Sequence, residues 1–379
     1  MTGKPTALIA GAGFAGLTAA TALAQRGWSV TVLERQPQLR ASGAGIYIWE
    51  NGLRILESLG LGGLAKNAYR GHAMEQRGHD NSILDDGGLP PAVRLVTLHR
   101  RDLLEGLKGA AEKAGVEIRT NHEVIGASAQ GELLLPGRRS LRADLVIGAD
   151  GVWSPIRKSL GLELGHQQTT EGAIRTIIEG GTDDLGPGGE DKYIECWSGM
   201  RRFLITPLAS HQIYLALTCQ ETDEEGRAYP LNKTSWRSSF PHWAHLIDRI
   251  DDVLSWSPYS IVTVRSWSAG HAAILGDAAH AQPPNLGQGG GMAMQSALAL
   301  AAYMEGVTDS RDIPGRLAQW ERNERPLAEH CQHWSCLYGE VSTLPDDVRA
   351  RAIPKAMADP WVRSELLRAA NSRPTGAVA

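Results

Sequence analysis

The chain has 379 residues, of which 42% are hydrophobic, and a formal net charge of −4. This length suits two domains, and the small negative charge argues against a general nucleic-acid binder. No apolar run beyond residue 24 approaches the length of a membrane span, so no membrane partner is expected.

The chain begins with the order strand, glycine turn, helix, strand and acidic residue. Gly11 permits a sharp turn, Gly13 permits close approach to a pyrophosphate, and Gly16 permits tight packing of helix on sheet. Free N–H groups at the helix start favour phosphate. Glu34 follows the second strand about twenty residues on, where a carboxylate accepts ribose hydroxyls. The segment therefore predicts a dinucleotide-binding βαβ unit.

A secretory signal peptide is the main alternative for this segment, because Lys4 precedes a mostly apolar stretch that reaches Ala24. Thr18, Thr21 and the spaced glycines are unlike the leucine-rich centre of such a peptide. The strand that leads to Glu34 also has no place in one.

The next elements alternate between helical and extended patterns. Helices are predicted over 52–61 and 100–114, strands over 93–98, 116–119, 122–129, 132–135 and 141–147, and loops or short strands over 71–91. The pattern then changes to short alternating strands at 173–179, 191–198, 201–206 and 211–219, which predicts an antiparallel sheet. Residues 233–254 are predicted helical, 259–264 extended, 288 onward and 316 onward helical, and the last seven or so disordered.

These patterns predict a discontinuous nucleotide-binding domain around an inserted sheet domain. We assign residues 1–70, 92–170 and 265–310 to the first, residues 71–91 and 171–264 to a substrate-binding sheet domain, and residues 311–379 to C-terminal helices and a tail. An active site between the two domains is expected.

Two later motifs each place an aspartate at the end of a strand. One runs from Asp144 through Asp150-Gly151 to Arg157, and the other from Ala273 through Gly276-Asp277 to Met292. In the second, residues 286–291 form a glycine-rich helix start whose N–H groups and dipole can face a flavin edge that becomes negative on reduction. There is no second GxGxxG motif, so a nicotinamide cofactor is expected to bind only transiently.

Together and in this order, the three motifs resemble those of the group A flavin-dependent aromatic hydroxylases, over most of the chain. The resemblance implies an α/β fold: a Rossmann-like FAD-binding domain of the p-hydroxybenzoate hydroxylase type, an inserted antiparallel-sheet substrate domain and a C-terminal helical segment. It implies that FAD contacts Gly11, Gly13, Phe14, Ala15, Gly16, Glu34, Arg35, Arg40, Arg100, Val124, Asp150, Gly276, Asp277, Leu286, Gly287, Gly289 and Gly290.

Within that family, stretches such as Gly43-Ala-Gly-Ile-Tyr47 are most similar to the 2-methyl-3-hydroxypyridine-5-carboxylate oxygenases. The resemblance implies a substrate pocket lined by Tyr47, Arg175, Arg202, Tyr214, Tyr259 and Pro284, with Tyr214, Arg202 and Tyr47 as the catalytic group. A buried arginine there suits a carboxylate or phenolate. Residues 72–86 lack the pocket tyrosine that the family has in this region, and the sister 6-hydroxynicotinate 3-monooxygenases are less similar.

The expected activity is that of an FAD monooxygenase that uses NADH or NADPH and O₂. It would hydroxylate a small anionic hydroxylated pyridine or benzene carboxylate through a flavin C4a-hydroperoxide, with or without ring opening or decarboxylation. A flavin oxidoreductase of the same fold that does not activate O₂, and a non-catalytic flavin-binding protein, are the alternatives.

The remaining expectations are a cytoplasmic monomer or homodimer with no metal site. The four cysteines show neither CxxC nor framework spacing, which is typical of free thiols. We interpret Cys331-x-His333-x-x-Cys336 as one face of a buried helix rather than as ligands of a metal.

Overall fold

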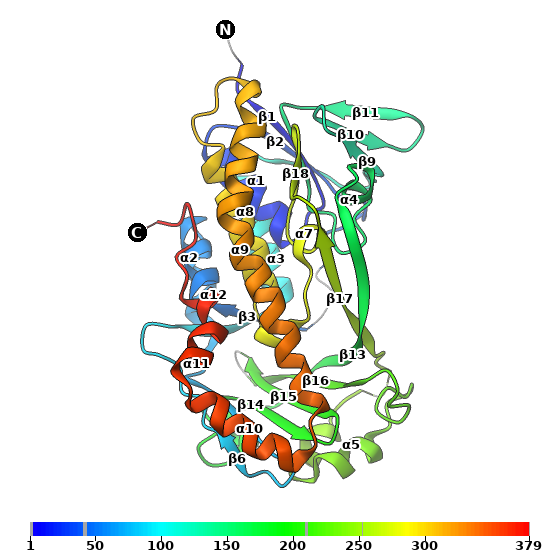
Figure 1. Ribbon diagram of the computed structural model, residues 1–379, viewed down its shortest axis with the longest axis vertical. Helices are drawn as coiled ribbons and strands as arrows, with labels where there is room; N and C mark the ends of the chain where they lie inside the picture. The colour runs from blue at the N-terminus through cyan, green and yellow to red at the C-terminus, as the bar shows by residue number, and fades with distance from the viewer. Residues whose placement is uncertain (1–2, 41–43, 209–210, 252, 379) are drawn as a thin grey trace.

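The computed structural model describes residues 3–40, 44–208, 211–251 and 253–378 (Figure 1). Gly43 of the Gly-Ala-Gly-Ile-Tyr stretch lies outside the described residues. No helix in the described ranges is both long and apolar enough to cross a membrane.

A six-stranded sheet forms the core of the nucleotide-binding part. Its spatial order is β18 (Ser268–Ala269), β19 (Ala272–Ile274), β12 (Leu145–Gly148), β1 (Thr6–Ala10), β2 (Ser29–Leu33) and β8 (Glu117–Arg119). All neighbouring strands are parallel except β18 and β19. Ile9, Val32 and Ile147 are fully buried, as expected for a parallel sheet covered on both faces. The strand order means that the first, middle and late parts of the chain build one sheet.

Helices cover the six-stranded sheet, and two small sheets flank it. The helices are α1 (Phe14–Gln25), α2 (Glu50–Ser58), α3 (Arg100–Lys113), α4 (Pro155–Ser159), α7 (Asp277–His280) and α8 (Gly289–Tyr303). The small sheets are β3 (Gly45–Trp49), β7 (Leu95–His99) and β4 (Tyr69–Arg70), and β11 (Arg139–Arg142), β10 (Glu132–Leu135) and β9 (Gly126–Ser128). Helices α1 and α8 are mostly buried and pack against each other.

The inserted part is a seven-stranded sheet. Its spatial order is β17 (Ser257–Val264), β13 (Glu163–Glu179), β16 (Gln212–Gln220), β15 (Arg201–Leu208), β14 (Lys192–Ser198), β5 (Ala73–Arg77) and β6 (Ile83–Asp85). One face packs Ile174, Phe203 and Leu215 against α5 (Lys233–Ser239) and α6 (Ala244–Ile247). Side chains of the other face, which is thus free of these helices, meet the nucleotide-binding part and the C-terminal helices.

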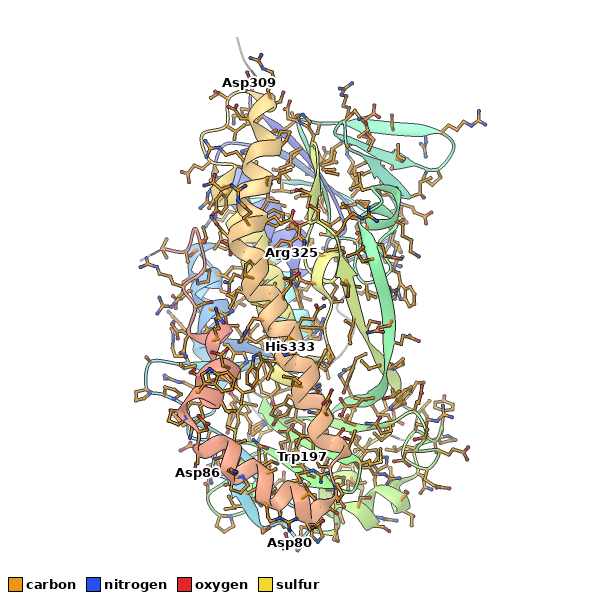
Figure 2. The ribbon with its side chains drawn as sticks, viewed as in Figure 1. Asp80, Asp86, Trp197, Asp309, Arg325 and His333 are labelled. Atoms are coloured by element: carbon orange, nitrogen blue, oxygen red, sulfur yellow. The ribbon has the colours of Figure 1, made fainter. Side chains whose placement is uncertain are left out.

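The C-terminal segment runs along both parts of the molecule. Helix α9 (Ile313–Glu340) starts beside β18 and extends toward the seven-stranded sheet, as the positions of Asp309, Arg325 and His333 show in Figure 2. Helices α10 (Asp346–Ala358), α11 (Pro360–Leu366) and α12 (Arg368–Asn371) then return toward α2 (Figure 1). Short 3₁₀ turns are η1 (Gly62–Asn67), η2 (Thr182–Leu185), η3 (Pro241–Trp243), η4 (Pro284–Leu286), η5 (Ser310–Asp312) and η6 (Val341–Thr343).

The structure differs from the sequence prediction in four respects. β13 begins at Glu163, ten residues early, and the seven-stranded sheet is mixed because β14 and β5 are parallel. The predicted helix over 233–254 is two short helices with η3, which begins at Pro241, between them. The tail prediction was wrong: Thr375 Oγ1 donates to Glu324 Oε1 at 2.7 Å, and Val378 N donates to Ser58 Oγ at 3.0 Å. The domain limits themselves stay a prediction.

Candidate flavin and substrate site

The glycine turn after β1 has the backbone geometry that only glycine adopts without strain. Gly11 has φ +100°, and a Cβ there would lie 2.3 Å from the Ala149 carbonyl oxygen. A Cβ on Gly16 would lie 2.0 Å from the Gly11 carbonyl oxygen, so α1 sits tightly against the turn. A Cβ on Gly13 would meet nothing within 4 Å. The turn is therefore closed on the protein side and open at Gly13, where a pyrophosphate would approach.

The Glu34 carboxylate lies at the end of β2 beside this turn. Its Oε2 accepts from Ala12 N and its Oε1 accepts from Gln36 N, each at 2.9 Å. Arg35 and Arg40 are exposed, and Val124 is buried just beyond His122, whose N donates to the Glu34 carbonyl oxygen at 2.9 Å. Glu34 and Val124, both predicted FAD contacts, thus lie close to each other beside the glycine turn.

The oppositely charged Arg100 and Asp277 lie near each other, with Arg100 beside the Phe14 ring. The Arg100 guanidinium lies 5.0 Å from the centre of the Phe14 ring, and burial lowers its pKa against the opposing effect of Asp277. The Asp277 side chain is accessible to solvent, yet surrounding protein desolvates it enough to raise its pKa. Solvent thus reaches the Asp277 carboxylate although protein surrounds it, so this side chain lines a deep hollow. Gly276 precedes it with φ +56°.

The turn before α8 is held in place by the neighbouring β3 and α2. Trp49 Nε1 donates to the Leu286 carbonyl oxygen at 3.1 Å, and a Cβ on Gly287, which has φ +63°, would lie 3.2 Å from Tyr47 Cβ. Asn51 Nδ2 donates to Gln295 Oε1 at 3.0 Å. A Cβ on Gly290 would lie 2.8 Å from Ile46 Cδ1, whereas a Cβ on Gly289 would meet nothing. The helix start is thus fixed, with an open side at Gly289.

Arg175 is the central charged residue on the free face of the seven-stranded sheet. Its guanidinium lies 5.3 Å from the centre of the Tyr259 ring, and its charge acts on the neighbouring Tyr214 hydroxyl. Burial raises the pKa of Tyr214, and the nearby charges of Arg175 and Arg100 act in the opposite direction. Tyr214 also packs on Gly45, because a Cβ there would lie 2.9 Å from Tyr214 Cγ. These contacts join Arg175 to the Arg100 end of the hollow.

Tyr47 lies on β3 at the side of this group. Its hydroxyl is hydrogen-bonded to Thr206 Oγ1 on β15, and its ring meets the Tyr193 ring edge-on at 5.2 Å between centres. Burial raises the pKa of Tyr47 well above the usual value. The phenol is therefore neutral and already has a partner across the interface between the two sheets.

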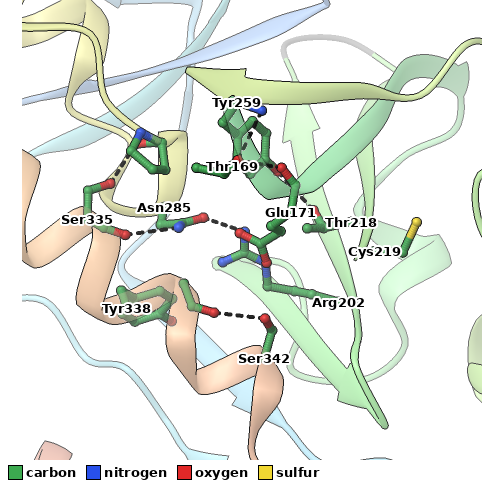
Figure 3. Close-up of polar contacts among 12 residues, drawn as sticks. Thr169, Glu171, Arg202, Thr218, Cys219, Tyr259, Asn285, Ser335, Tyr338 and Ser342 are labelled. Carbon is green, nitrogen blue, oxygen red and sulfur yellow. Dashed lines mark hydrogen bonds and ion pairs between the residues drawn. The ribbon is translucent and has the colours of Figure 1, made fainter. Parts of the chain in front are cut away.

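Arg202 lies on the same face as Tyr214, but at the other end of the strand pair. Arg202 is opposite Thr218 in the β15–β16 ladder, whereas Tyr214 is opposite Thr206. Its Nη1 donates to Glu195 Oε1 at 3.3 Å. Its Nη2 lies 3.8 Å from Glu171 Oε2, and Asn285 Oδ1 accepts from the same Nη2 (Figure 3). The guanidinium also lies 5.4 Å from the Trp197 ring centre. Arg202 is thus fully engaged by the protein.

The sequence analysis did not single out the residues that engage Arg202. Glu171 begins the pairing of β13 with β16, Glu195 is on β14, and Tyr338 of α9 donates its hydroxyl hydrogen to Glu195 Oε2. Asn285 belongs to η4, directly before the flavin-loop residues, and its Nδ2 donates to the Ser335 carbonyl oxygen at 2.9 Å. The cluster therefore links the seven-stranded sheet, the predicted flavin loop and α9.

A family model described as an FAD binding domain matches residues 4–335. The chain belongs to the group A FAD-dependent monooxygenases. This monooxygenase is 39% identical over 347 residues to the 2-heptyl-3-hydroxy-4(1H)-quinolone synthase of Mycobacteroides abscessus, which covers 90% of this chain and 92% of the relative. It uses FAD, with NAD(P)H and O₂ as the family does. This membership excludes the two alternatives, a flavin oxidoreductase that does not activate O₂ and a non-catalytic flavin-binding protein.

Solved structures of the family give the same fold. The monooxygenase matches a tetrameric form of 2-methyl-3-hydroxypyridine-5-carboxylic acid oxygenase with a TM-score of 0.87 and 33% identity, over 99% of this chain and 98% of that one. It also matches Klebsiella pneumoniae HpxO complexed with FAD and uric acid, with a TM-score of 0.82 and 20% identity, over 97% of each chain. The predicted fold of the p-hydroxybenzoate hydroxylase type is thereby confirmed.

The residues present fit a bound FAD. Arg100 Nε and Asp150 Oδ1 are buried, and neither has a hydrogen-bond partner among the described residues of the monooxygenase. One is a donor and the other an acceptor beside the glycine turn and the α8 turn, where a flavin nucleotide would supply the missing partners. Their roles, like those of the other predicted cofactor residues, stay a prediction.

Three other residues named in the sequence analysis lie on η4 and α9, and the substrate contact of Pro284 stays a prediction. Pro284 is exposed in η4, and Cys331 and Cys336 lie on α9. No group of three or more potential metal ligands occurs in the described part of the monooxygenase.

Proposed function

We propose that the chain hydroxylates a ring of the pyridine or quinolone type. The exocyclic oxygen of this ring, a hydroxyl or carbonyl group, binds Arg175 and Tyr214. The observation that carries this proposal is the environment of Arg175. Its guanidinium is half-buried, contacts Tyr214 and Tyr259, and forms no ion pair with a carboxylate among the described residues. A desolvated cation without a carboxylate partner suits an oxygen that carries negative charge.

Two relatives of more than 30% identity support a nitrogen heterocycle as the substrate. One is named as a 2-heptyl-3-hydroxy-4(1H)-quinolone synthase and the other as an oxygenase of a hydroxypyridine carboxylic acid. Both names describe an oxygen-bearing ring that contains nitrogen. The quinolone name contains no carboxylate, so the carboxylate expected from the sequence is not part of the proposal.

Each of the pocket residues has a defined task in this proposal. The bound FAD, with O₂, supplies the oxygen atom that is transferred. Arg175 stabilises the exocyclic oxygen as an anion. The negative charge on this oxygen raises the electron density on the neighbouring ring carbons. The Tyr214 hydroxyl donates a hydrogen bond to the same oxygen and orients the ring. Tyr47 and Thr206 close the side of the pocket, so that water is kept from the reacting carbon.

FAD would lie along the edge of the six-stranded sheet. Gly13 and Glu34 would hold the adenosine and pyrophosphate end. Arg100 and Asp277 would hold the middle, and the open side of α8 at Gly289 would face the ring system. This placement puts the reactive end of the cofactor beside Tyr214, where the nearby charge of Arg100 opposes the rise in the tyrosine pKa that burial causes.

The proposal is tested with purified protein that contains FAD. NADH and NADPH oxidation is followed with 4(1H)-quinolones, 3-hydroxypyridines and hydroxybenzoates, and products made under ¹⁸O₂ are analysed by mass spectrometry. We expect one heteroaromatic class to speed oxidation and to gain one labelled oxygen. Stimulation by hydroxybenzoates alone, or oxidation without labelled product from any ring, would refute the proposal.

A further inference from the structure

The Arg202 end of the free sheet face has more negative than positive groups. Arg202 is 5% exposed and faces two glutamates, Glu171 and Glu195, which are 7% and 8% exposed. In the described residues, the nearest charged neighbours that influence Arg202 are these two carboxylates. A cation between two carboxylates has no uncompensated charge to offer a ligand.

The compensation does not depend on both glutamates being ionised. Burial raises the pKa of Glu195, while Arg202 and the Tyr338 hydroxyl oppose this effect. When Glu195 is protonated, Glu171 alone balances Arg202. When Glu195 is ionised, the three groups carry a net negative charge. In neither state does a positive charge remain for an incoming anion.

One of the two carboxylate oxygens of Glu171 lacks a hydrogen-bond donor. Its Oε1 is buried and has no hydrogen-bond partner among the described residues. An ionised oxygen without a donor repels another carboxylate and raises the free energy of placing one nearby.

The cluster lies next to the pocket and not apart from it. Glu171 and Arg175 are four residues apart on β13 and therefore share a face, separated by about 13 Å along the strand. Tyr259 lies between them, because Arg175 stacks on its ring and both Arg202 and Glu171 influence its pKa. Asn285, bonded to Arg202, directly precedes the turn that leads into α8 (Figure 3). A ring bound at Arg175 thus extends toward this cluster.

We propose that Glu171 and Glu195 are specificity-determining residues, which neutralise Arg202 and so make the pocket reject rings that carry a carboxylate. This inference rests on the proposed function and narrows its substrate to carboxylate-free heteroaromatic rings. It also reverses the task that the sequence suggested for Arg202. The guanidinium holds Asn285 and two strands of the sheet instead of binding the substrate.

The test measures binding to the FAD-loaded protein through changes in the flavin absorbance. The probes are 4(1H)-quinolone, its 2- and 3-carboxylates and the uncharged 2- and 3-carboxamides, which separate the added charge from the added volume. We expect the wild-type protein to bind the uncharged ring about tenfold or more tightly than either carboxylate. Tighter binding of either carboxylate would overturn the inference, whatever the stability of any variant.

The variants Glu171→Gln and Glu195→Gln keep the shape of the side chains and remove a charge. Each single variant still leaves one glutamate to balance Arg202, so the double variant is the one expected to shift the preference toward a carboxylate by about tenfold, with FAD content unchanged. Glu179→Gln, at the exposed end of the same strand β13, is the matched control and leaves the preference unchanged. An unchanged preference in the double variant would overturn the inference.

The ¹⁸O₂ experiment separates this inference from the proposed function. If labelled product forms from a ring carboxylate that binds best, only the inference fails. If the uncharged ring binds best but no ring gains oxygen, the inference on binding stands and the proposed function fails. If none of these probes changes the flavin spectrum, the inference is overturned, and the ¹⁸O₂ panel, which also contains 3-hydroxypyridines, decides the proposed function separately.

Discussion

Two arginines on one sheet face have opposite electrostatic surroundings. Arg175 contacts tyrosines, whereas Arg202 faces two glutamates and an asparagine. The sequence predicts both in the substrate pocket and Arg202 also in the catalytic group. The difference arises because Glu171, Glu195 and Asn285 come from three separate segments that only the folded chain brings together.

Replacing Arg175 with methionine should weaken substrate binding and leave FAD in place. A charge-assisted hydrogen bond is worth about 1.5–3 kcal/mol, so the dissociation constant should rise roughly tenfold to a hundredfold. Arg142→Met, on the exposed strand β11, is the control. Titration of each holoprotein with the best ring of the panel measures the effect. Equal affinities for the two variants would remove Arg175 from the pocket.

His280 should make the protein less stable in mild acid. Burial lowers its pKa to about 4, and its ring lies 3.3 Å from Ser296 Oγ. Because an unfolded histidine titrates near 6.5, the unfolded chain binds a proton first as the pH falls. The stability is complete above about pH 6.5 and declines toward pH 4, by about 2 kcal/mol between pH 7.5 and 5.

Urea unfolding at saturating FAD measures this dependence. His280→Gln should flatten the pH profile between 6.5 and 5, and His242→Gln, at an exposed position, should not. Identical profiles for the two variants would show that His280 does not carry the effect.

At the scale of elements, the start of α8 is arranged for a flat ligand. Its preceding turn is fixed by Trp49 and its packing by Gly290, while Gly289 faces open space. Gly289→Ala should therefore fit the protein alone, and its methyl group should obstruct the flavin. We expect an unchanged melting temperature without FAD and an FAD affinity lower by about tenfold.

The control for this change is Gly109→Ala on α3, where a Cβ also meets nothing within 4 Å. Fluorescence titration of the apoprotein with FAD gives both affinities. If Gly289→Ala binds FAD as tightly as the control, the flavin lies elsewhere.

The sequence was sufficient for elements whose signals are local. The glycine spacing of residues 11–16, the strand before Asp277 and the alternation over 201–220 were all recognisable, and the structure confirms each strand or helix there. The length of β13 was not recognisable from the sequence. Its first half is polar and pairs with β17 in an irregular register, so apolar and polar residues do not alternate there. The ordered tail was not recognisable either, since Thr375 and Val378 are held by residues distant in the chain.

At the scale of the whole molecule, one buried arginine fastens the C-terminal segment to the seven-stranded sheet. Arg349 of α10 donates to the carbonyl oxygens of Gly199 and Leu344, both at 2.6 Å, pairs with Asp346 at 2.7 Å, and lies 5.3 Å from the Trp197 ring centre. Trp197 is thus enclosed between this arginine and Arg202, near the end of α9 in Figure 2.

Arg349→Ala should lower the free energy of unfolding by about 3 kcal/mol, because it removes a buried guanidinium that donates to several partly buried carbonyl groups. Arg351→Ala, two residues later and exposed, removes an ion pair with Asp347 and should cost less than 1 kcal/mol, roughly the value of surface pairs. Urea denaturation of both variants decides the point. Equal stability would mean that α10 is not fastened through Arg349.

The strand order of the six-stranded sheet has a consequence for synthesis in the cell. β1 can pair with β2 at once, but its other neighbour, β12, follows only at residues 145–148, and β19, the next strand beyond β12, only at residues 272–274. Asp277 and the turn before α8 come later still. The FAD-binding motif at the N-terminus therefore leaves the ribosome long before the rest of its site exists. We expect cofactor capture to be a late event, which follows translation of residue 291 and does not guide the folding of the first half of the chain.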